Sequence, residues 1–429
     1  MKILWITNNP LPEFFSEIKG NPVPGGSWIS ALAYALSQDK EIQLAVVTNV
    51  SGGVYQKLQQ GSVIQYTVPI KQNGWYTIND VYPELIDWYQ QVESDFNPDV
   101  IHIHGTERYF GLLSGRKLLK APTVISIQGI ITACYDHYLG GLKESTLLKT
   151  RSLKNFLLGG GILNQRKVYW KYLPIEHEIL RNNTYFFCRT GWDRAQVLSY
   201  NKDAVIFQGE ELLRKPFYNI NWSLAKARRH SIFISSGSIP LKGLHVMLEA
   251  LSILKQDFPD VLLRIPIDGE RFYKVNRLTS NDYEIYLHNL VKKYGLTENL
   301  ELLGKLNADQ MASTFASSHS FVLTSFTENS PNSLGEAMKV GTPSVVSPVG
   351  GVPDMVQDNN SALFATSGNA VMFAQQIKRL FQDDDLARTL SENGKRIAAK
   401  RHDVPGTVEQ YKSGYKQMQQ HSVVVPASN

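Results

Sequence analysis

The chain has 429 residues and a formal net charge of +5, from 44 Lys and Arg against 39 Asp and Glu. This length predicts two or three domains, and so weak a positive charge does not by itself indicate a nucleic-acid partner. The 43% of hydrophobic residues excludes a mostly disordered chain, and the two cysteines, Cys134 and Cys188, exclude a disulfide scaffold and favour a reducing compartment.

Short apolar runs alternate with amphipathic stretches of helical length along the chain. A first series of strands is predicted at residues 2–7, 43–48, 99–104, 123–127, 184–188 and 204–207. A second series is predicted at residues 231–235, 261–267, 300–303, 320–324 and 344–347. Helices are predicted at residues 27–37, 80–95, 243–255, 282–294 and 309–316. Apolar strands separated by helices are typical of parallel sheets covered on both faces. The sequence therefore predicts an α/β protein with two doubly wound, Rossmann-like domains, and a closed eight-stranded barrel is the alternative topology.

The two series are separated by residues 208–229, which lack strand character and contain a Pro and a basic cluster. We therefore expect domains at residues 1–212 and 213–404, followed by a helix at about 405–420. No run reaches about 18 apolar residues, and the apolar run at the start is too short for a signal-peptide core. We expect a cytoplasmic protein.

One basic segment departs from the alternation of strands and helices. Residues 143–171 contain seven Lys or Arg and one Glu, interleaved with Leu, Phe, Tyr and Trp. Such a segment can lie peripherally on an anionic membrane surface, here the inner face of the cytoplasmic membrane. It can also bind an anionic acceptor, or form a solvated helix that covers the first sheet.

A glycine pair follows the first predicted strand. Gly25 and Gly26 precede Ser27, which begins a predicted helix. Because glycines have no Cβ, backbone N–H groups at a helix N-terminus can approach a phosphate closely. The alternative is an ordinary turn with Ser27 as N-cap.

The strongest local motif lies at residues 324–343, TSFTENSPNSLGEAMKVGTP. A strand ends at Thr324, and Glu328 and Glu336 follow it in a loop and in the next helix. Ligands of open parallel sheets bind beyond the carboxyl ends of strands, so both carboxylates are candidates for binding sugar hydroxyls. The N–H groups of Ser333, Leu334 and Gly335 suit a diphosphate. The alternative is a surface acid and a helix N-terminal acid.

This motif resembles the donor-binding core of family-4 glycosyltransferases. The similarity lies in the Glu328–Glu336 spacing, the Ala-Met and Gly-Thr-Pro that follow, and GGVPD at residues 350–354. Residues 238–243, SIPLKG, resemble the phosphate-binding segment of that family, and residues 189–195 and 213–218 resemble its bacterial surface-polysaccharide branch. The resemblance implies retaining enzymes of the GT-B fold, with two domains facing across a cleft and the last helix returning to the first domain.

The resemblance also implies roles for individual residues. Glu328, Lys242 and His104 would be catalytic: Glu328 would contact the donor sugar and Lys242 would neutralise the departing diphosphate. The implied donor- and nucleotide-binding residues are Glu336 (on the ribose), Gly25, Gly26, Ser238, Ser333, Leu334, Gly335 and Gln128. No metal and no other cofactor is expected, and the Asp383-Asp384-Asp385 run is interpreted as a turn with an N-cap rather than a metal motif.

Two departures from the family pattern matter. Residues 236–238 read Ser-Gly-Ser, where many relatives carry an Arg; Arg228, Arg229 or Arg264 is a candidate substitute, and backbone amides are the alternative. Gln128 stands where many relatives have His, and Gln cannot act as a general acid near neutral pH.

The resemblance thus implies transfer of a sugar from a nucleotide diphosphate sugar to a growing glycan or a polyprenyl-linked acceptor in surface-polysaccharide synthesis, without a nucleic-acid partner. Two other functions remain open from the sequence. One is a nucleotide-sugar epimerase on a similar fold, and the other is a catalytically silent protein that binds nucleotide sugars and scaffolds an assembly.

Overall fold

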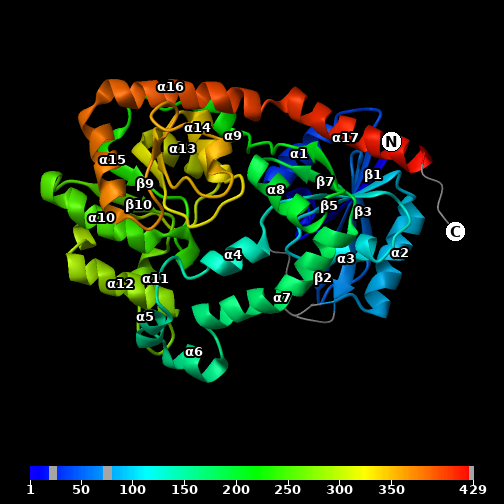
Figure 1. The fold of residues 1–429 in the computed structure, drawn as a ribbon, viewed down its shortest axis with the longest axis horizontal. Helices are drawn as coiled ribbons and strands as arrows, with labels where there is room; N and C mark the ends of the chain where they lie inside the picture. Colours follow the sequence, from blue (N-terminus) through cyan, green and yellow to red (C-terminus); the bar gives the residue numbers. More distant parts are fainter. Residues whose placement is uncertain (19–26, 71–79, 425–429) are drawn as a thin grey trace. The chain divides into compact units, whose positions relative to one another are not determined.

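The computed structural model describes residues 1–18, 27–70 and 80–424 (Figure 1). The chain divides into two compact units. Unit 1 comprises residues 1–132, 171–214 and 402–429, and unit 2 comprises residues 133–170 and 215–401. Along the described ranges, no helix combines the length and the apolar character needed to cross a bilayer.

Among its described residues, unit 1 forms an eight-stranded sheet in the order β3-β4-β2-β1-β5-β6-β7-β8. The strands are β1 (Lys2–Thr7), β2 (Gln43–Ser51), β3 (Gln56–Gln60), β4 (Val63–Ile70), β5 (Val100–His104), β6 (Thr123–Ser126), β7 (Tyr185–Cys188) and β8 (Val205–Gln208). All neighbours pair in parallel except the β3–β4 hairpin at the edge. The helices of this unit include α1 (Ser27–Ser37), α2 (Pro83–Phe96), α3 (Phe110–Gly115), α8 (Gly191–Tyr200) and α17 (Val404–Val424).

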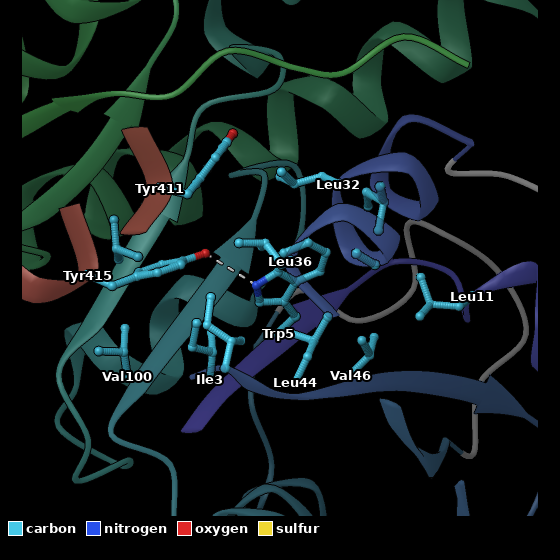
Figure 2. Close-up of a cluster of buried hydrophobic side chains, with 14 of the residues drawn as sticks. Ile3, Trp5, Leu11, Leu32, Leu36, Leu44, Val46, Val100, Tyr411 and Tyr415 are labelled. Atoms are coloured by element: carbon cyan, nitrogen blue, oxygen red, sulfur yellow. Dashed lines mark hydrogen bonds between the residues drawn. The ribbon is translucent and has the colours of Figure 1, made fainter. Parts of the chain in front are cut away.

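The core of unit 1 includes the C-terminal helix. Trp5 of β1 is fully buried among apolar side chains of α1 and β2, and α17 adds Tyr411, Tyr415 and Met418 to the same cluster (Figure 2). The Trp5 indole Nε1 donates to the Tyr415 hydroxyl at 3.3 Å, and His102 Nδ1 lies 2.7 Å from that hydroxyl. Residues more than 300 positions apart thus complete one core.

Unit 2, whose residues are all described, forms a six-stranded parallel sheet in the order β11-β10-β9-β12-β13-β14. The strands are β9 (Arg228–Phe233), β10 (Leu262–Ile265), β11 (Leu300–Leu302), β12 (Ser318–Leu323), β13 (Ser344–Val346) and β14 (Leu363–Phe364). The helices are α5 (Glu144–Lys149), α6 (Leu153–Leu158), α9 (Pro216–Asn219), α10 (Leu244–Asp257), α11 (Gly269–Tyr273), α12 (Asp282–Tyr294), α13 (Ala308–Ser317), α14 (Asn332–Val340), α15 (Ala370–Gln382) and α16 (Asp384–Arg401). Two further helices, α4 (Ile131–His137) and α7 (Ile162–Asn182), contain the divisions between the units.

The two sheets share one topology. In each, the first strand of the series lies beside both the second and the fourth parallel strand, so the winding reverses between β1 and β5 in unit 1 and between β9 and β12 in unit 2. This is the strand order of a Rossmann sheet, and ligands of such sheets bind at the carboxyl edge beside the reversal. The predicted fold class of two Rossmann-like parallel sheets is confirmed.

The unit boundaries differ from the predicted domains, 1–212 and 213–404, at residues 133–170. These residues belong to unit 2 because their backbone is hydrogen-bonded there: Leu153 N donates to Arg277 O at 2.8 Å, and His245 Nε2 donates to Gly140 O at 3.0 Å. The interpretation of residues 143–171 as one helix over the first sheet is therefore wrong for α5 and α6.

We expect Tyr415→Phe to lower the free energy of unfolding by about 1–3 kcal/mol. The substitution removes the hydroxyl that His102 and Trp5 contact, and unsatisfied buried polar groups cost roughly that much. Urea unfolding followed by circular dichroism measures the change. The control is Tyr34→Phe, because Tyr34 is 66% exposed. Equal stability of the two variants would contradict this role of α17.

Candidate functional site

The carboxyl edge of the unit 2 sheet brings two loops together. Residues 234–243 follow β9 and end in a 3-10 turn, Pro240–Lys242, directly before α10. Residues 324–331 follow β12 and lead into α14. Because β9 and β12 are the strands between which the winding reverses, these loops occupy the expected ligand-binding edge.

Lys242 and Glu328 meet at this edge as an ion pair. Lys242 Nζ lies 2.6 Å from Glu328 Oε1, which also accepts a hydrogen bond from Ser325 Oγ at 2.7 Å. The Lys242 side chain is 30% exposed and that of Glu328 11%. Burial alone would lower the pKa of Lys242, but the adjacent Glu328 carboxylate raises it above its ordinary value. The ammonium therefore stays charged, and part of it faces solvent.

Two glycines allow close backbone approaches at this edge, Gly243 between these two loops and Gly350 between the loop after β12 and the loop after β13. Gly243 has φ +72°, and a Cβ there would lie 2.1 Å from the carbonyl oxygen of Thr324. Gly350 has φ +55°, and a Cβ there would lie 1.8 Å from the carbonyl oxygen of Glu328. Both values are far inside van der Waals contact, so a side chain at either position would force the loops apart.

Hydrogen bonds fix the same loops to one another. Phe326 N donates to Leu241 O at 2.9 Å, and Thr324 Oγ1 donates to Lys242 O at 2.9 Å. On the other side, Gly351 N donates to Glu328 O at 3.1 Å. The backbone on either side of the ion pair is thus held by partners from outside its own loop.

Helix α14 places the second predicted carboxylate. Glu336 lies one turn beyond the first helical residue, Asn332, and is 5% exposed. The N–H groups of Leu334 and Gly335 donate to Pro331 O at 3.0 and 3.2 Å. The expectation that these two amides are exposed to a diphosphate is therefore wrong, because they form the first turn of the helix. Ser333, at the second helical position, remains a candidate amide donor.

The arginines predicted to substitute for the missing Arg lie away from the phosphate segment or contact other residues. Arg228 and Arg229 begin β9, so roughly 13–17 Å of strand separates them from its carboxyl end. Arg229 forms a two-point contact with Asp384, at 2.7 and 3.0 Å, and Arg264 bonds Glu301 at 2.9 Å. The assignment of these arginines to the phosphate segment is therefore wrong. Ser238 is exposed in that segment.

Sequence reasoning missed a different arginine. Arg401, the last residue of α16, donates from its guanidinium Nη2 to Ser330 Oγ at 3.2 Å. Ser330 directly precedes Pro331, the N-cap of α14. A cation from a helix some 70 residues downstream thus reaches the loop that carries Glu328, which no local motif indicates.

The Asp383-Asp384-Asp385 run behaves as predicted. Asp383 Oδ1 accepts the N–H groups of Asp385 and Leu386 at 3.1 and 2.9 Å, which caps α16. Among the described residues, no group of three or more His, Cys, Asp or Glu is placed to hold a metal ion.

The carboxyl edge of the unit 1 sheet carries the other predicted residues. His104 ends β5, is 2% exposed and lies against Trp5 and His102, with ring centroids 4.5 and 3.9 Å away. Burial lowers the pKa of His104 to about 3. His104 is therefore neutral near pH 7 and poorly suited to donate a proton there. Gly25 and Gly26 lie outside the described residues.

Gln128 follows β6, and its backbone is positioned by Arg189. The Arg189 guanidinium donates to the carbonyl oxygens of Ile127 and Gln128 at 3.1 and 2.8 Å. Arg189 itself is paired with Glu211 at 2.7 Å, and both side chains are buried. The motif at residues 189–195 therefore supports the loop that carries Gln128.

A buried carboxyl at this edge was missed by sequence reasoning. Glu107 Oε1 accepts the Gly129 N–H at 2.6 Å. Glu107 Oε2 is buried without a hydrogen-bond partner in the described structure. Gly105 has φ +101°, and a Cβ there would lie 2.1 Å from Oε2. Burial raises the pKa of Glu107 to about 7, and the neighbouring Glu176 carboxyl acts in the same direction.

Comparison with known proteins relates the chain to glycosyltransferases. Residues 218–397 match the family model "Glycosyl transferases group 1". An uncharacterized glycosyltransferase of Methanocaldococcus jannaschii is 26% identical over 162 residues, which are 38% of this chain and 41% of the relative. The chain thus matches less than half the length of that curated relative.

Solved structures resemble the whole chain. Sucrose-phosphate synthase from Thermosynechococcus elongatus has a TM-score of 0.70 at 16% identity, covering 98% of this chain and all of the other. Anabaena HepE in complex with UDP and glucose has a TM-score of 0.65 at 16% identity, covering 96% and 98%. At this identity the likeness establishes the fold, and together with the family model it supports a relationship to group 1 glycosyltransferases of the GT-B fold.

We expect Gly350→Ala to destabilise unit 2 by at least about 3 kcal/mol, because it adds overpacking to the cost of a left-handed backbone. The control is Gly304→Ala, at φ +68° with open space around the added Cβ, which should cost about 1 kcal/mol. Denaturant unfolding compares the two variants, and equal costs would refute the close approach to Glu328.

Glu107 should make stability depend on pH. Its raised pKa means that the folded state binds more protons than the unfolded state between about pH 4.5 and 7. Its contribution therefore weakens the fold as pH rises through this window, by up to about 3 kcal/mol. We expect Glu107→Gln to gain stability relative to the parent as pH rises from 4.5 to 8 in thermal unfolding. Glu13→Gln, at an exposed carboxyl, is the control, and parallel curves for Glu107→Gln and the parent would refute the assignment.

Proposed function

We propose that this chain is a retaining glycosyltransferase of family 4, which transfers a sugar from a nucleoside diphosphate sugar to a growing glycan or polyprenyl-linked acceptor. The observation that carries the proposal is the Lys242–Glu328 pair at the reversal point of the unit 2 sheet, beside the loop into α14. An ammonium and a carboxylate at the carboxyl edge of a Rossmann sheet match the two halves of such a donor, its diphosphate and its sugar hydroxyls.

The donor binds unit 2 in this proposal. Lys242, held charged by Glu328, contacts the diphosphate, with the exposed Ser238 and the Ser333 amide as further donors. Glu328 accepts hydrogen bonds from sugar hydroxyls, and Glu336 accepts them from the ribose. The presence of UDP in the HepE complex is consistent with a uridine nucleotide as the first donor to test.

The reaction exchanges one bond at the anomeric carbon. The bond from that carbon to the diphosphate oxygen breaks, and a bond to the acceptor hydroxyl oxygen forms on the same face. The hydroxyl proton passes to the departing phosphate, so the step requires no protein base, in keeping with the low pKa of His104. A charged hydrogen bond from Lys242 to the leaving group contributes about 1.5–3 kcal/mol.

Unit 1 serves the acceptor in this proposal. Glu107 offers a carboxyl group at its carboxyl edge, and His104 supports that edge by packing against Trp5. Gln128, at the same edge, stays a candidate for contact with the donor, as the family resemblance implies. Gly25 and Gly26 remain candidates for contact with the donor. We assign the activity to surface-polysaccharide synthesis on the inner face of the cytoplasmic membrane, in line with the sequence of residues 189–195 and 213–218.

Titration calorimetry with a panel of UDP-, GDP- and ADP-sugars tests the donor site. We expect one sugar nucleotide to bind, and Glu336→Gln to weaken it at least tenfold because a ribose acceptor is lost. The matched control, Glu392→Gln, changes an exposed carboxylate on α16 and should leave the affinity unchanged. Unchanged affinity in Glu336→Gln would remove the ribose assignment.

Isotope-labelled donor, incubated with and without acceptor, tests the reaction. Labelled glycan supports transfer, an isomerised donor would instead indicate an epimerase, and tight binding without turnover would indicate a silent scaffold. Lys242→Met should reduce turnover about tenfold or more. Because this change leaves Glu328 partly buried and without its counter-charge, circular dichroism melting of the variant separates loss of the ammonium from loss of folding.

A further inference from the structure

Helix α6 presents its apolar side chains to solvent. Phe156, Leu157 and Leu158 are 64, 69 and 75% exposed, and Leu153 at the start of the helix is 51% exposed. Ser152 and Asn155, in contrast, are buried. This is the reverse of an ordinary surface helix, whose apolar stripe faces the core.

Polar contacts hold the helix in this orientation. Asp282, at the start of α12, accepts from Ser152 N at 3.2 Å and from Asn155 Nδ2 at 2.7 Å. Ser152 Oγ in turn accepts the Asn155 N–H, which caps α6. The backbone N–H groups of Leu153 and Lys154 donate to the carbonyl oxygens of residues 277 and 278 at 2.8 and 3.0 Å. The outward direction of the apolar side chains is therefore fixed by specific bonds.

The exposed apolar side chains form a cluster in unit 2. Among the described residues, fourteen large apolar side chains are exposed. Five of them lie within residues 148–158, and a sixth is at residue 278 in the adjoining loop. They are Leu148, Leu153, Phe156, Leu157, Leu158 and Leu278. Figure 1 shows α6 at the margin of unit 2, beyond α5 and α12. A concentration of this kind marks an interaction surface.

Cations predominate in the segment that carries the cluster. Residues 145–165 contain Lys149, Arg151 and Lys154 and no acidic residue. The adjoining loop adds Arg277, whose guanidinium donates to Lys149 O. Two acids close to this segment are engaged: Glu144, whose side chain is 59% exposed, pairs with Arg166, and Asp282 is buried and accepts hydrogen bonds from α6. A partner for this surface therefore combines an apolar interior with a negatively charged boundary.

We propose that this surface, the α6 patch, docks on the headgroup region of an anionic lipid bilayer. The side chains of residues 156–158 enter the acyl boundary, while Lys149, Arg151, Lys154 and Arg277 remain at the level of the lipid phosphates. A short helix with bulky apolar residues among cations suits the interface rather than a span. The proposal concerns a surface outside the donor site and holds whatever sugar chemistry the protein performs.

Sedimentation with vesicles tests the patch in the full-length chain. We expect binding to vesicles of phosphatidylglycerol and phosphatidylcholine, weaker binding to phosphatidylcholine alone, and loss of binding as salt rises. The variant Phe156→Ser/Leu157→Ser/Leu158→Ser should bind at least tenfold more weakly. Val371→Ser is the matched control, because Val371 is 59% exposed on α15 of the same unit. Circular dichroism melting verifies that both variants stay folded.

The charges are tested separately. Lys149→Gln/Lys154→Gln should reduce binding to anionic vesicles severalfold and leave the weak binding to phosphatidylcholine unchanged. Absence of salt-sensitive binding by the parent, or equal loss in Val371→Ser and the triple variant, would overturn the proposal. A parent that self-associates through the patch without binding vesicles would also overturn it, by identifying a second copy as the occupant. Transfer to a water-soluble acceptor should survive in the triple variant, so failure here is distinguishable from failure of the proposed function.

Discussion

The candidate site of unit 2 depends on two backbones approaching more closely than any side chain allows. Gly243 lies against the carbonyl of Thr324, and Gly350 lies against the carbonyl of Glu328. The first contact brings the loop after β9 to the loop after β12, so that Lys242 can reach Glu328 at 2.6 Å. The second contact joins the loop that carries Glu328 to the loop after β13. The chemistry proposed for the site therefore rests on the absence of two Cβ atoms.

The carboxyl groups at the edges of the two sheets have different electrostatic surroundings. In unit 2 the Glu328 side chain pairs with an ammonium in a partly solvated position, and this pairing holds the pKa of Lys242 above its ordinary value. In unit 1 Glu107 is buried without a paired cation among the described residues and lies near a second carboxyl, Glu176, so its pKa rises to about 7 although backbone amides donate to it. A compensated pair suits electrostatic binding of a diphosphate, whereas a carboxyl that titrates near neutrality suits hydrogen bonding to a hydroxyl.

Much of the fold was predictable because buried parallel strands are continuous apolar runs, such as β1 and β5, whose bounds agree with prediction to within one residue. The edge strand β3, Gln56–Gln60, was missed because it is polar and carries no such signal. Its neighbour β4, Val63–Ile70, was also missed, although its residues VIQYTVPI are mostly apolar and buried. Glu328 and Lys242 were predictable from motifs next to strand ends. Glu107 also follows a strand end, three residues after β5, so its place at the edge was predictable and only its burial was not. Arg401 was not predictable, because a tertiary contact alone brings it to the loop that carries Glu328. Arg228 could have been rejected from sequence, since it begins its strand.

The orientation of α6 could not be predicted from hydrophobic periodicity. The pattern of residues 152–158, SLKNFLL, gives the positions of the apolar side chains but not the side that faces the protein. Asp282, about 130 residues later, decides this by binding Ser152 and Asn155, because a buried carboxylate needs donors and α6 supplies them. The apolar residues are then left outside, where water is a poor partner for them. Buried polar hydrogen bonds thus impose an orientation that exposes the apolar side chains to water. This orientation is explained if a second apolar phase receives those side chains. An anionic bilayer supplies such a phase, together with negative charges for the surrounding cations.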